Sequence, residues 1–193
     1  MDTRNFIVQF NNLDPQCLNE SIVEIPNVSR LDLIKWVRML DFKVGAELGV
    51  AYAEYSKDIC DINFQMKLYG IDSWAPYKGY KDFTKQSTFS RMEEEARHRM
   101  KVYIQRDRYE IRKGFSMDVV SQFEDNFFDF LYIDANHQDP WVTQDINAWS
   151  KKVRSGGIVA GHDYVKVKRV NGDEFAVKEA IQKYTKENNI KGQ

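Results

Sequence analysis

The sequence predicts a doubly wound α/β fold, in which a mostly parallel sheet carries helices on both faces. Short apolar runs alternate five times with segments of helical periodicity along the chain. This alternation is typical of β-α-β units, which build parallel sheets. Each apolar run also ends in a small or polar residue. Because ligands of such sheets bind at the carboxyl ends of the strands, these terminal residues are the candidates for a functional site.

The composition is that of one ordinary globular domain. The 193 residues are 42% hydrophobic and 30% charged, and the formal net charge of −1 gives no reason to expect a nucleic-acid or membrane partner. The two cysteines, Cys17 and Cys60, match no metal-ligand or disulfide spacing, and the N-terminus lacks a signal-peptide pattern. No apolar run approaches the roughly 18 residues of a membrane span. A cytoplasmic setting is therefore expected.

The chain divides into an N-terminal arm, residues 1–28, and a main domain, residues 29–193. Residues 6–10 fit either a strand or a packed arm. Ser29 is a candidate helix N-cap, because an acid follows three positions later and apolar residues then recur at helical spacing. A helix is therefore expected before the first strand, which starts at Val44.

The remaining elements follow in order along the chain. Helices are expected at 52–66, at about 91–105, at 142–153 and at about 174–188. Strands are expected at 68–72, 109–113, 127–134 and 158–160. Proline, glycine and polar residues over 75–90 favour a loop or lid, and the pair Gly156 and Gly157 favours a turn before the last strand.

The strand ends bring small and acidic residues to one edge of the predicted sheet. Gly49 and its small neighbours allow a ligand to approach the backbone, and the next helix offers free N–H groups. Asp72 ends the second strand, where an acid can accept both hydroxyl groups of a ribose. The other strand ends read Gly114-Phe115-Ser116-Met117, Asp134-Ala135-Asn136-His137 and Gly161-His162-Asp163-Tyr164.

A nicotinamide dinucleotide is one alternative ligand for this edge. Its fingerprint G-x-G-x-x-G, placed at Gly45, puts Glu47 and Val50 at the second and third glycine positions. Glu47 would then direct a carboxylate at a pyrophosphate, which is electrostatically unfavourable. S-adenosylmethionine has no phosphate and carries a sulfonium and an ammonium group, so an acid in this loop suits it.

Three segments of the sequence resemble a known enzyme family. VGAELGVAYAEYS, residues 44–56, resembles motif I of class I methyltransferases, and Asp72 in YGIDSW resembles their ribose-binding acid. FLYIDANH, residues 130–137, and GGIVAGHDY, residues 156–164, are similar to small-molecule O-methyltransferases related to macrocin and catechol O-methyltransferases. The similarity covers roughly residues 30–188. It implies a Rossmann-like fold and an S-adenosylmethionine-dependent enzyme that methylates a hydroxyl group of a small-molecule acceptor.

The resemblance also implies contacts with the cofactor. The methionine part would lie on Glu47, Gly49, Tyr52 and Ser56. The ribose would lie on Asp72, Ser73 and Trp74, and the adenine beside Ser116 and Met117. Asp134 is counted both with these cofactor residues and with the metal ligands that the resemblance implies.

In metal-dependent relatives the residues that match Asp134, His162 and Asp163 bind magnesium, so Mg²⁺ or another divalent metal is expected there. Magnesium prefers oxygen ligands, and His162 departs from a purely oxygen set. A metal would activate and orient the acceptor hydroxyl. The alternative is a metal-independent reaction with His137 or His162 as general base, because imidazole titrates near neutrality. A structural His137, bonded to the backbone or to Asp145, is equally open.

Two further functions are weighed against this one. Nucleic-acid amino-methyltransferases commonly carry an Asn/Asp-Pro-Pro-aromatic tetrapeptide after the fourth strand, where this chain has residues 134–137, so a nucleic-acid acceptor is not expected. A non-catalytic domain that keeps the fold is the other alternative. It is retained because the family sheet continues with two more strands, which are missing before Gln193. Either the chain is truncated or another segment, such as residues 5–10, completes the edge. An unfinished edge would favour a homo-oligomer.

Overall fold

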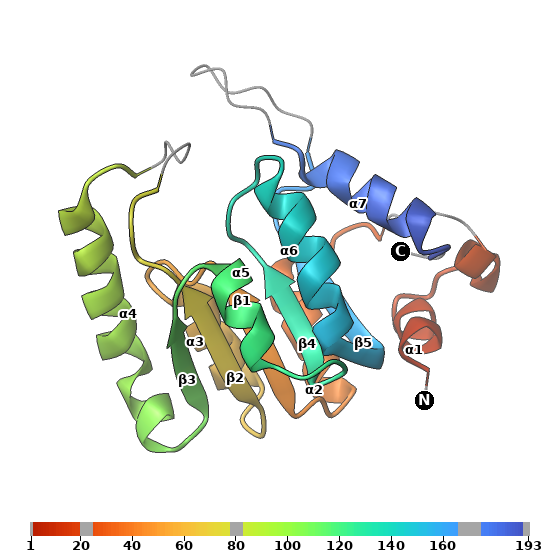
Figure 1. Ribbon diagram of the computed structural model, residues 1–193. Coiled ribbons are helices and arrows are strands. Elements are labelled where there is room, and N and C mark those ends of the chain that lie inside the picture. The colour runs from red at the N-terminus through yellow and green to blue at the C-terminus, as the bar shows by residue number, and fades with distance from the viewer. Residues whose placement is uncertain (1, 20–24, 78–82, 166–174, 191–193) are drawn as a thin grey trace.

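The computed structural model describes residues 2–19, 25–77, 83–165 and 175–190. Within them the chain forms one five-stranded sheet in the order β3-β2-β1-β4-β5, and every pair of neighbours is parallel (Figure 1). The strands are β1 (Val44–Leu48), β2 (Lys67–Asp72), β3 (Tyr109–Lys113), β4 (Phe128–Ile133) and β5 (Val153–Gly161). The predicted doubly wound α/β fold is confirmed.

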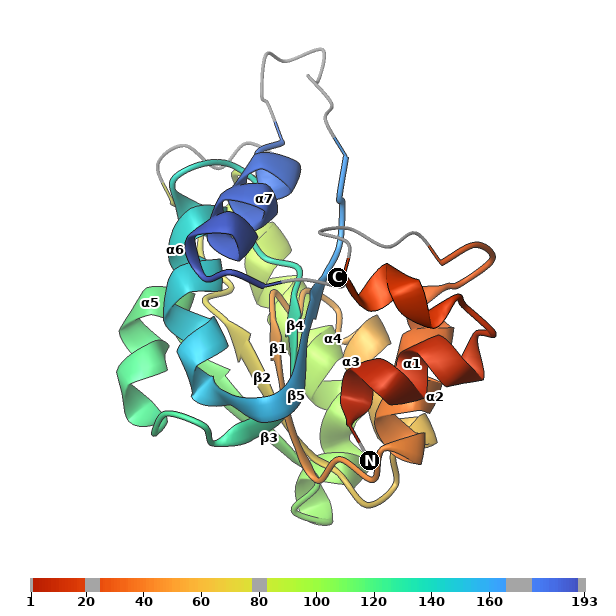
Figure 2. The ribbon, with the colours of Figure 1, turned by 90° about the vertical axis from the view of Figure 1, so that its right-hand side faces the viewer.

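Helices cover both faces of the sheet, as Figure 2 shows in a view along the sheet. One face carries α2 (Arg30–Met39), α3 (Glu54–Ile62) and α4 (Gln86–Gln105). The other carries α5 (Ser116–Val119), η2 (Val120–Gln122), α6 (Trp141–Trp149), η3 (Ser150–Lys152) and α7 (Val177–Glu187). No helix in the described ranges is long and apolar enough to cross a membrane.

The alternation of side chains along β4 produces a separate apolar core on each face. Phe130 and Tyr132 pack into the core under α2, α3 and α4, whereas Leu131 and Ile133 pack under α5, α6 and α7. A strand that is buried on both faces reads as a continuous apolar run, because successive side chains point in opposite directions. This explains why FLYI was recognisable as a strand.

The helix before β1 begins as its capping residues predict. The Ser29 side chain accepts a hydrogen bond from the Asp32 N–H, and the Asp32 carboxylate accepts one from the Ser29 N–H at 3.0 Å. These reciprocal bonds satisfy two backbone donors that a helix end leaves free. The Arg30–Met39 helix therefore starts where the sequence places it.

The N-terminal segment is a helix, so of the two alternatives for residues 6–10 the strand is wrong and the packed arm is observed. In α1 (Thr3–Phe10) the Asp2 side chain accepts a hydrogen bond from the Arg4 N–H, and Phe6 is buried. The Thr3 hydroxyl donates to the Gly156 carbonyl of β5, and Figure 2 shows α1 beside that strand. A short 3₁₀ turn, η1 (Pro15–Asn19), follows. The segment lies beside the sheet edge without adding a strand.

Two other elements differ from the predicted boundaries. Helix α4 begins at Gln86, inside the segment expected to be a loop, and residues 78–82 of that segment lie outside the described residues. Gly156 and Gly157 lie within β5, so the predicted turn is wrong. The pairing with β4 shifts here, and a Cβ on Gly157 would lie 2.6 Å from the Asp129 carbonyl oxygen. The glycines therefore mark a bulge with a close backbone approach.

Candidate functional site

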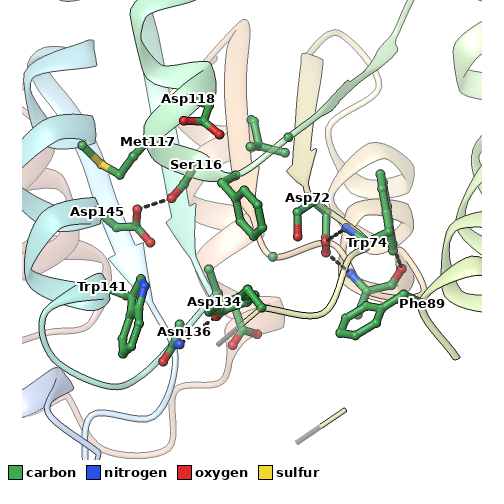
Figure 3. Close-up of a pocket in the computed structure, with 18 of the residues that line it drawn as sticks. Asp72, Trp74, Phe89, Ser116, Met117, Asp118, Asp134, Asn136, Trp141 and Asp145 are labelled. Carbon is green, nitrogen blue, oxygen red and sulfur yellow. Dashed lines mark hydrogen bonds between the residues drawn. The ribbon is translucent and has the colours of Figure 1, made fainter. Parts of the chain in front are cut away.

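A cavity of about 360 Å³ lies at the carboxyl edge of the sheet, between the ends of the strands and the starts of α5 and α6 (Figure 3). Ligands of doubly wound sheets bind at this position. Seven of the residues predicted to bind the cofactor line the cavity: Gly49, Asp72, Ser73, Trp74, Ser116, Met117 and Asp134. Residues that follow the ends of β1, β2, β3 and β4 therefore lie together at one edge of the sheet, as the sequence predicts.

The turn after β1 depends on Gly49, which has φ of +85°. A Cβ at this position would lie 2.1 Å from the Asp134 carbonyl oxygen. The Gly49 N–H donates to the Ile71 carbonyl, and the Asp134 N–H donates to the Leu48 carbonyl, so the turn is held against both neighbouring strands. Only glycine permits this approach, and it forms the floor of the cavity at the end of β1.

Asp72 at the end of β2 organises the loops on either side of it. Its Oδ2 accepts hydrogen bonds from the N–H groups of Val50 and Ala51, both at 2.9 Å, and its Oδ1 accepts one from Trp74 at 2.8 Å. Burial raises the pKa of Asp72, although these three donors oppose the shift. A carboxylate oxygen can accept two hydrogen bonds, so Oδ1 retains capacity for a ligand hydroxyl.

Glu47, Tyr52 and Ser56 do not line the cavity. Glu47 is 2% exposed and accepts a hydrogen bond from Ser56, whose hydroxyl lies 3.0 Å from that of Tyr109. Burial raises the pKa of Glu47 to about 8. The Tyr52 hydroxyl accepts a hydrogen bond from Arg91 at 3.0 Å. The structure thus places Glu47 and Ser56 in a buried polar network that is not part of the cavity lining.

A second group of residues gathers around His137. Its Nε2 lies 3.2 Å from Asp134 Oδ1 and 3.4 Å from Asp163 Oδ2. Its ring packs edge-on against Phe175, with 5.2 Å between the ring centroids. His162 lies on the far side of Asp163, with Nδ1 3.1 Å from Asp163 Oδ1. The imidazole of His137 is therefore placed between two carboxylates, one of which lines the cavity.

The predicted metal ligands do not form a metal-binding group. Among the described residues, no three His, Cys, Asp or Glu side chains are arranged to hold a metal ion. Asp134 and Asp163 both contact His137, whereas His162 contacts Asp163 and, within the described ranges, forms an ion pair with neither Asp134 nor another acid. In this arrangement the donors of Asp134, His162 and Asp163 do not fit a divalent metal.

Asp145 also lines the cavity, although the sequence predicts no contact between Asp145 and the cofactor. It is 3% exposed, and the Ser116 hydroxyl donates to its Oδ1. Burial raises the pKa of Asp145 to about 6. The partner proposed for it, His137, bonds to Asp134 instead. The sequence signal that could have indicated Asp145 is its spacing of four residues from Trp141. Residues four apart on a helix share one face, and Trp141 and Asp145 both line the cavity.

A family model described as a methyltransferase domain matches residues 43–164. This range runs from the residue before β1 to just beyond Asp163 and contains all the cavity and His137-cluster residues except Phe175. Comparison with curated proteins gives no match.

Several solved structures share the fold over most of their length. A protein from Staphylococcus aureus assigned as a caffeoyl-CoA O-methyltransferase has 16% identity and a TM-score of 0.58, covering 97% of this chain and 82% of its own. An O-methyltransferase from Bacillus cereus in complex with S-adenosylhomocysteine has 16% identity and a TM-score of 0.58, covering 96% and 78%. A precorrin-6y C5,15-methyltransferase from Geobacter metallireducens has 10% identity and a TM-score of 0.54, covering 88% and 77%. Because the names of the first and third of these proteins refer to different acceptors, the shared fold does not identify the acceptor.

Proposed function

Because the chain belongs to the methyltransferase domain family, we propose that it transfers the methyl group of S-adenosylmethionine to a hydroxyl group of a small molecule. The family match confirms the prediction of a methyltransferase. The observation that carries the proposal for the cofactor is the cavity at the strand ends, with Asp72 on one side and Ser116 and Met117 on the other.

The cavity suits a nucleoside that carries positive charge and no phosphate. Asp72 offers Oδ1 to ribose hydroxyl groups, while its hydrogen bonds to Val50 and Ala51 hold the β1–α3 loop in place. Asp134 lines the same cavity and adds negative charge near the end of β4. A sulfonium or ammonium group is attracted to this carboxylate, whereas a pyrophosphate would be repelled by it.

His137 is the proposed general base. S-adenosylmethionine, when bound, would supply its methyl group to the acceptor oxygen and would leave as S-adenosylhomocysteine, with the electron pair of the broken carbon–sulfur bond on sulfur. The hydroxyl proton passes to the imidazole of His137. Asp134 and Asp163 lie 3.2 and 3.4 Å from its Nε2, so they would stabilise the positive charge that the ring gains. His162 would keep Asp163 in position through their 3.1 Å contact.

Binding of S-adenosylhomocysteine, measured by titration calorimetry, tests the cofactor assignment. The Asp72→Asn variant should lose at least about tenfold in affinity, because it loses the charge that strengthens the bond to the ribose. Asp129→Asn is the matched control. The Asp129 carboxylate also accepts two backbone N–H groups, from Lys43 and Val44, but these lie at the start of β1, at the opposite end of the sheet. No binding to folded wild-type protein would reject the proposal.

A turnover assay on the same protein distinguishes catalysis by His137 as general base from metal-assisted catalysis. In turnover assays that follow S-adenosylhomocysteine release with a panel of phenols and sugars, His137→Gln should lower kcat by about 10²-fold or more while leaving cofactor affinity unchanged. Activity that survives this substitution and disappears with a chelator would favour the metal-assisted alternative.

A further inference from the structure

A second cavity, of about 380 Å³, lies between β5 and the helices α6 and α7, which pack against each other on the same side of that strand (Figure 2). We call it the α6–α7 cavity. Its walls are mostly aliphatic, and they include Ile133, Val142, Ile146, Val159, Val177 and Ile181. Protein cores contain few voids larger than a water molecule, so an apolar space of this size is suited to a ligand.

The α6–α7 cavity adjoins the cavity assigned to the cofactor. Ala135 and Asn136, which follow β4, line both cavities. Asp134 lines the cofactor cavity and lies 3.2 Å from Nε2 of His137, which lines the α6–α7 cavity. The proposed general base therefore stands where the two cavities meet, so a molecule in the second cavity can present a hydroxyl group to the cofactor in the first.

The polar groups of the α6–α7 cavity favour an uncharged ligand. Arg154 lines the cavity at the start of β5, but its Nε donates to the Asp129 carboxylate at 2.6 Å and its Nη1 donates to the Ser155 carbonyl at 2.9 Å. The charge of Arg154 is thus already paired. Among the described residues, the other ionisable side chains of the lining are two histidines and Tyr184. A ligand carboxylate, or several hydroxyl groups, would therefore lose hydration against aliphatic walls without enough compensating partners.

We propose that the α6–α7 cavity binds the methyl acceptor, and that this acceptor is an uncharged hydroxy compound with an apolar body of the size of two fused rings. This inference rests on the proposed function, because it takes the adjoining cavity as the cofactor site. The acceptor hydroxyl lies at the end that holds Asn136 and His137, and the apolar body lies between β5 and α7. An apolar cavity of about 150 Å³ can hold benzene, so this larger cavity has room for a second ring. A sugar is excluded, since each hydroxyl group buried without a partner costs free energy.

Titration calorimetry with 2-naphthol, an uncharged hydroxy compound of two fused rings, tests the cavity. Wild-type protein should bind one equivalent with a Kd below about 100 μM, whereas methyl glucoside should give no binding up to about 10 mM. The titration is repeated on protein saturated with S-adenosylhomocysteine. Binding of 2-naphthol should persist, because the two ligands occupy adjoining cavities. Displacement of 2-naphthol by S-adenosylhomocysteine would mean that the probe enters the cofactor cavity instead.

The variant Val159→Phe tests where the probe binds. Val159 is in register with Leu131, which packs in the core under α6 and α7, so both side chains point to that face of the sheet. The added ring enters the α6–α7 cavity, and 2-naphthol affinity should fall at least about tenfold while S-adenosylhomocysteine affinity stays unchanged. Val102→Phe on α4 is the matched control. Val102 is 49% exposed, against 42% for Val159, and it lines neither cavity, so this variant should bind both ligands as wild type does.

The possible outcomes distinguish failure of the acceptor site from failure of the proposed function. If S-adenosylhomocysteine does not bind to folded wild-type protein, the proposed function fails, and the acceptor assignment fails with it. If S-adenosylhomocysteine binds but 2-naphthol does not, or is displaced by it, the acceptor site is overturned while the cofactor assignment stands, and this result needs no variant. Equal 2-naphthol affinity in Val159→Phe and wild type also overturns it. The thermal midpoint of Val159→Phe should stay within about 2 °C of wild type, and a larger fall would show that part of this chain already fills the cavity, which overturns the proposal.

Discussion

Glu47 lies on β1 with 2% of its surface exposed, and its carboxyl group accepts a hydrogen bond from Ser56. The hydroxyl groups of Ser56 and Tyr109 lie 3.0 Å apart, and Gly70 leaves room for the tyrosine, since a Cβ there would lie 1.9 Å from its hydroxyl oxygen. Burial raises the pKa of Glu47 to about 8, and the carboxylates of Asp134 and Asp72 add to this shift. The side chain is therefore expected to be mainly neutral at pH 7.

Replacing Glu47 by Gln should remove a loss of stability that develops as the pH rises. The folded protein keeps the Glu47 proton up to about pH 8, whereas the unfolded chain releases it above about pH 4.3, so the free energy of unfolding falls between these values. Glutamine resembles the neutral acid and does not titrate. Relative to wild type, Glu47→Gln should therefore gain on the order of 3 kcal/mol between pH 5 and pH 8.5, at about 1.4 kcal/mol per pKa unit.

Urea unfolding at the two pH values measures this difference. Glu124→Gln is the control, because Glu124 is exposed and its variant should follow the wild-type pH dependence. A stability difference between Glu47→Gln and wild type that stays constant with pH would contradict a neutral, buried Glu47.

Sequence reasoning found those site residues whose position follows from the backbone. Gly49 and Asp72 are fixed by the ends of β1 and β2, and both reach the cavity. Glu47 and Ser56 belong to the same motif, but whether they face the ligand depends on side-chain direction and on Tyr109, which is distant in the sequence. The alternative contact between His137 and Asp145 is not formed, and the contact of Asp145 with Ser116, which joins α5 and α6, could not be predicted for the same reason.

At the scale of elements, capping residues predicted where a helix begins better than apolar periodicity did. The capping bonds of Ser29 place the start of α2, whereas α4 extends several residues further toward the N-terminus than its apolar pattern indicated. The sequence predicts a turn at Gly156 and Gly157, because glycine is typical both of turns and of strand bulges. The bulge depends on the backbone of β4, which no local window of sequence contains.

The turn between β1 and α3 gives a prediction at this scale. Gly49→Ala should destabilise the protein more than Gly156→Ala does, although both glycines have positive φ, at +85° and +77°. The conformational strain costs about 1–2 kcal/mol at either position. Only at Gly49 would the new Cβ meet a backbone oxygen, that of Asp134, at 2.1 Å, whereas at Gly156 it meets only the flexible end of Arg154 at 3.4 Å.

The free energy of unfolding, measured by urea titration, should therefore fall by about 2 kcal/mol more in Gly49→Ala than in Gly156→Ala. S-adenosylhomocysteine affinity should fall only in Gly49→Ala, because this glycine lines the cavity and Gly156 does not. Equal losses of stability in the two variants would show that the turn yields enough to remove the contact with β4.

For the whole molecule, the alternation of strands and helices predicted the fold class, because the central strands β1, β2 and β4 are buried on both faces and the helices that cover them are buried on one. The strand order β3-β2-β1-β4-β5 was not predicted, since it depends on which long-range pairs of strands associate. The strands that separate the two cores also carry the cavity at their carboxyl ends. A ligand there contacts elements of both helical layers, among them Trp74 on one side and Trp141 on the other.

This arrangement predicts that the two cores unfold together and that S-adenosylhomocysteine stabilises both. Trp74 is fully buried in one core and Trp149 in the other, and the two cores share the same sheet. Loss of either layer exposes the apolar strand surface that this layer covers and so destabilises the sheet on which the other layer packs. Thermal unfolding followed by far-UV circular dichroism and by tryptophan fluorescence should give one midpoint temperature.

S-adenosylhomocysteine at 100 times its Kd should raise the midpoint temperature of both signals by the same amount, about 5–10 °C. This follows because binding adds about 2.7 kcal/mol to the free energy of unfolding of a chain of this size. Asp72→Asn at the same ligand concentration should show a smaller rise. Midpoints that separate, or a ligand shift in only one signal, would mean that the two layers are not one cooperative unit.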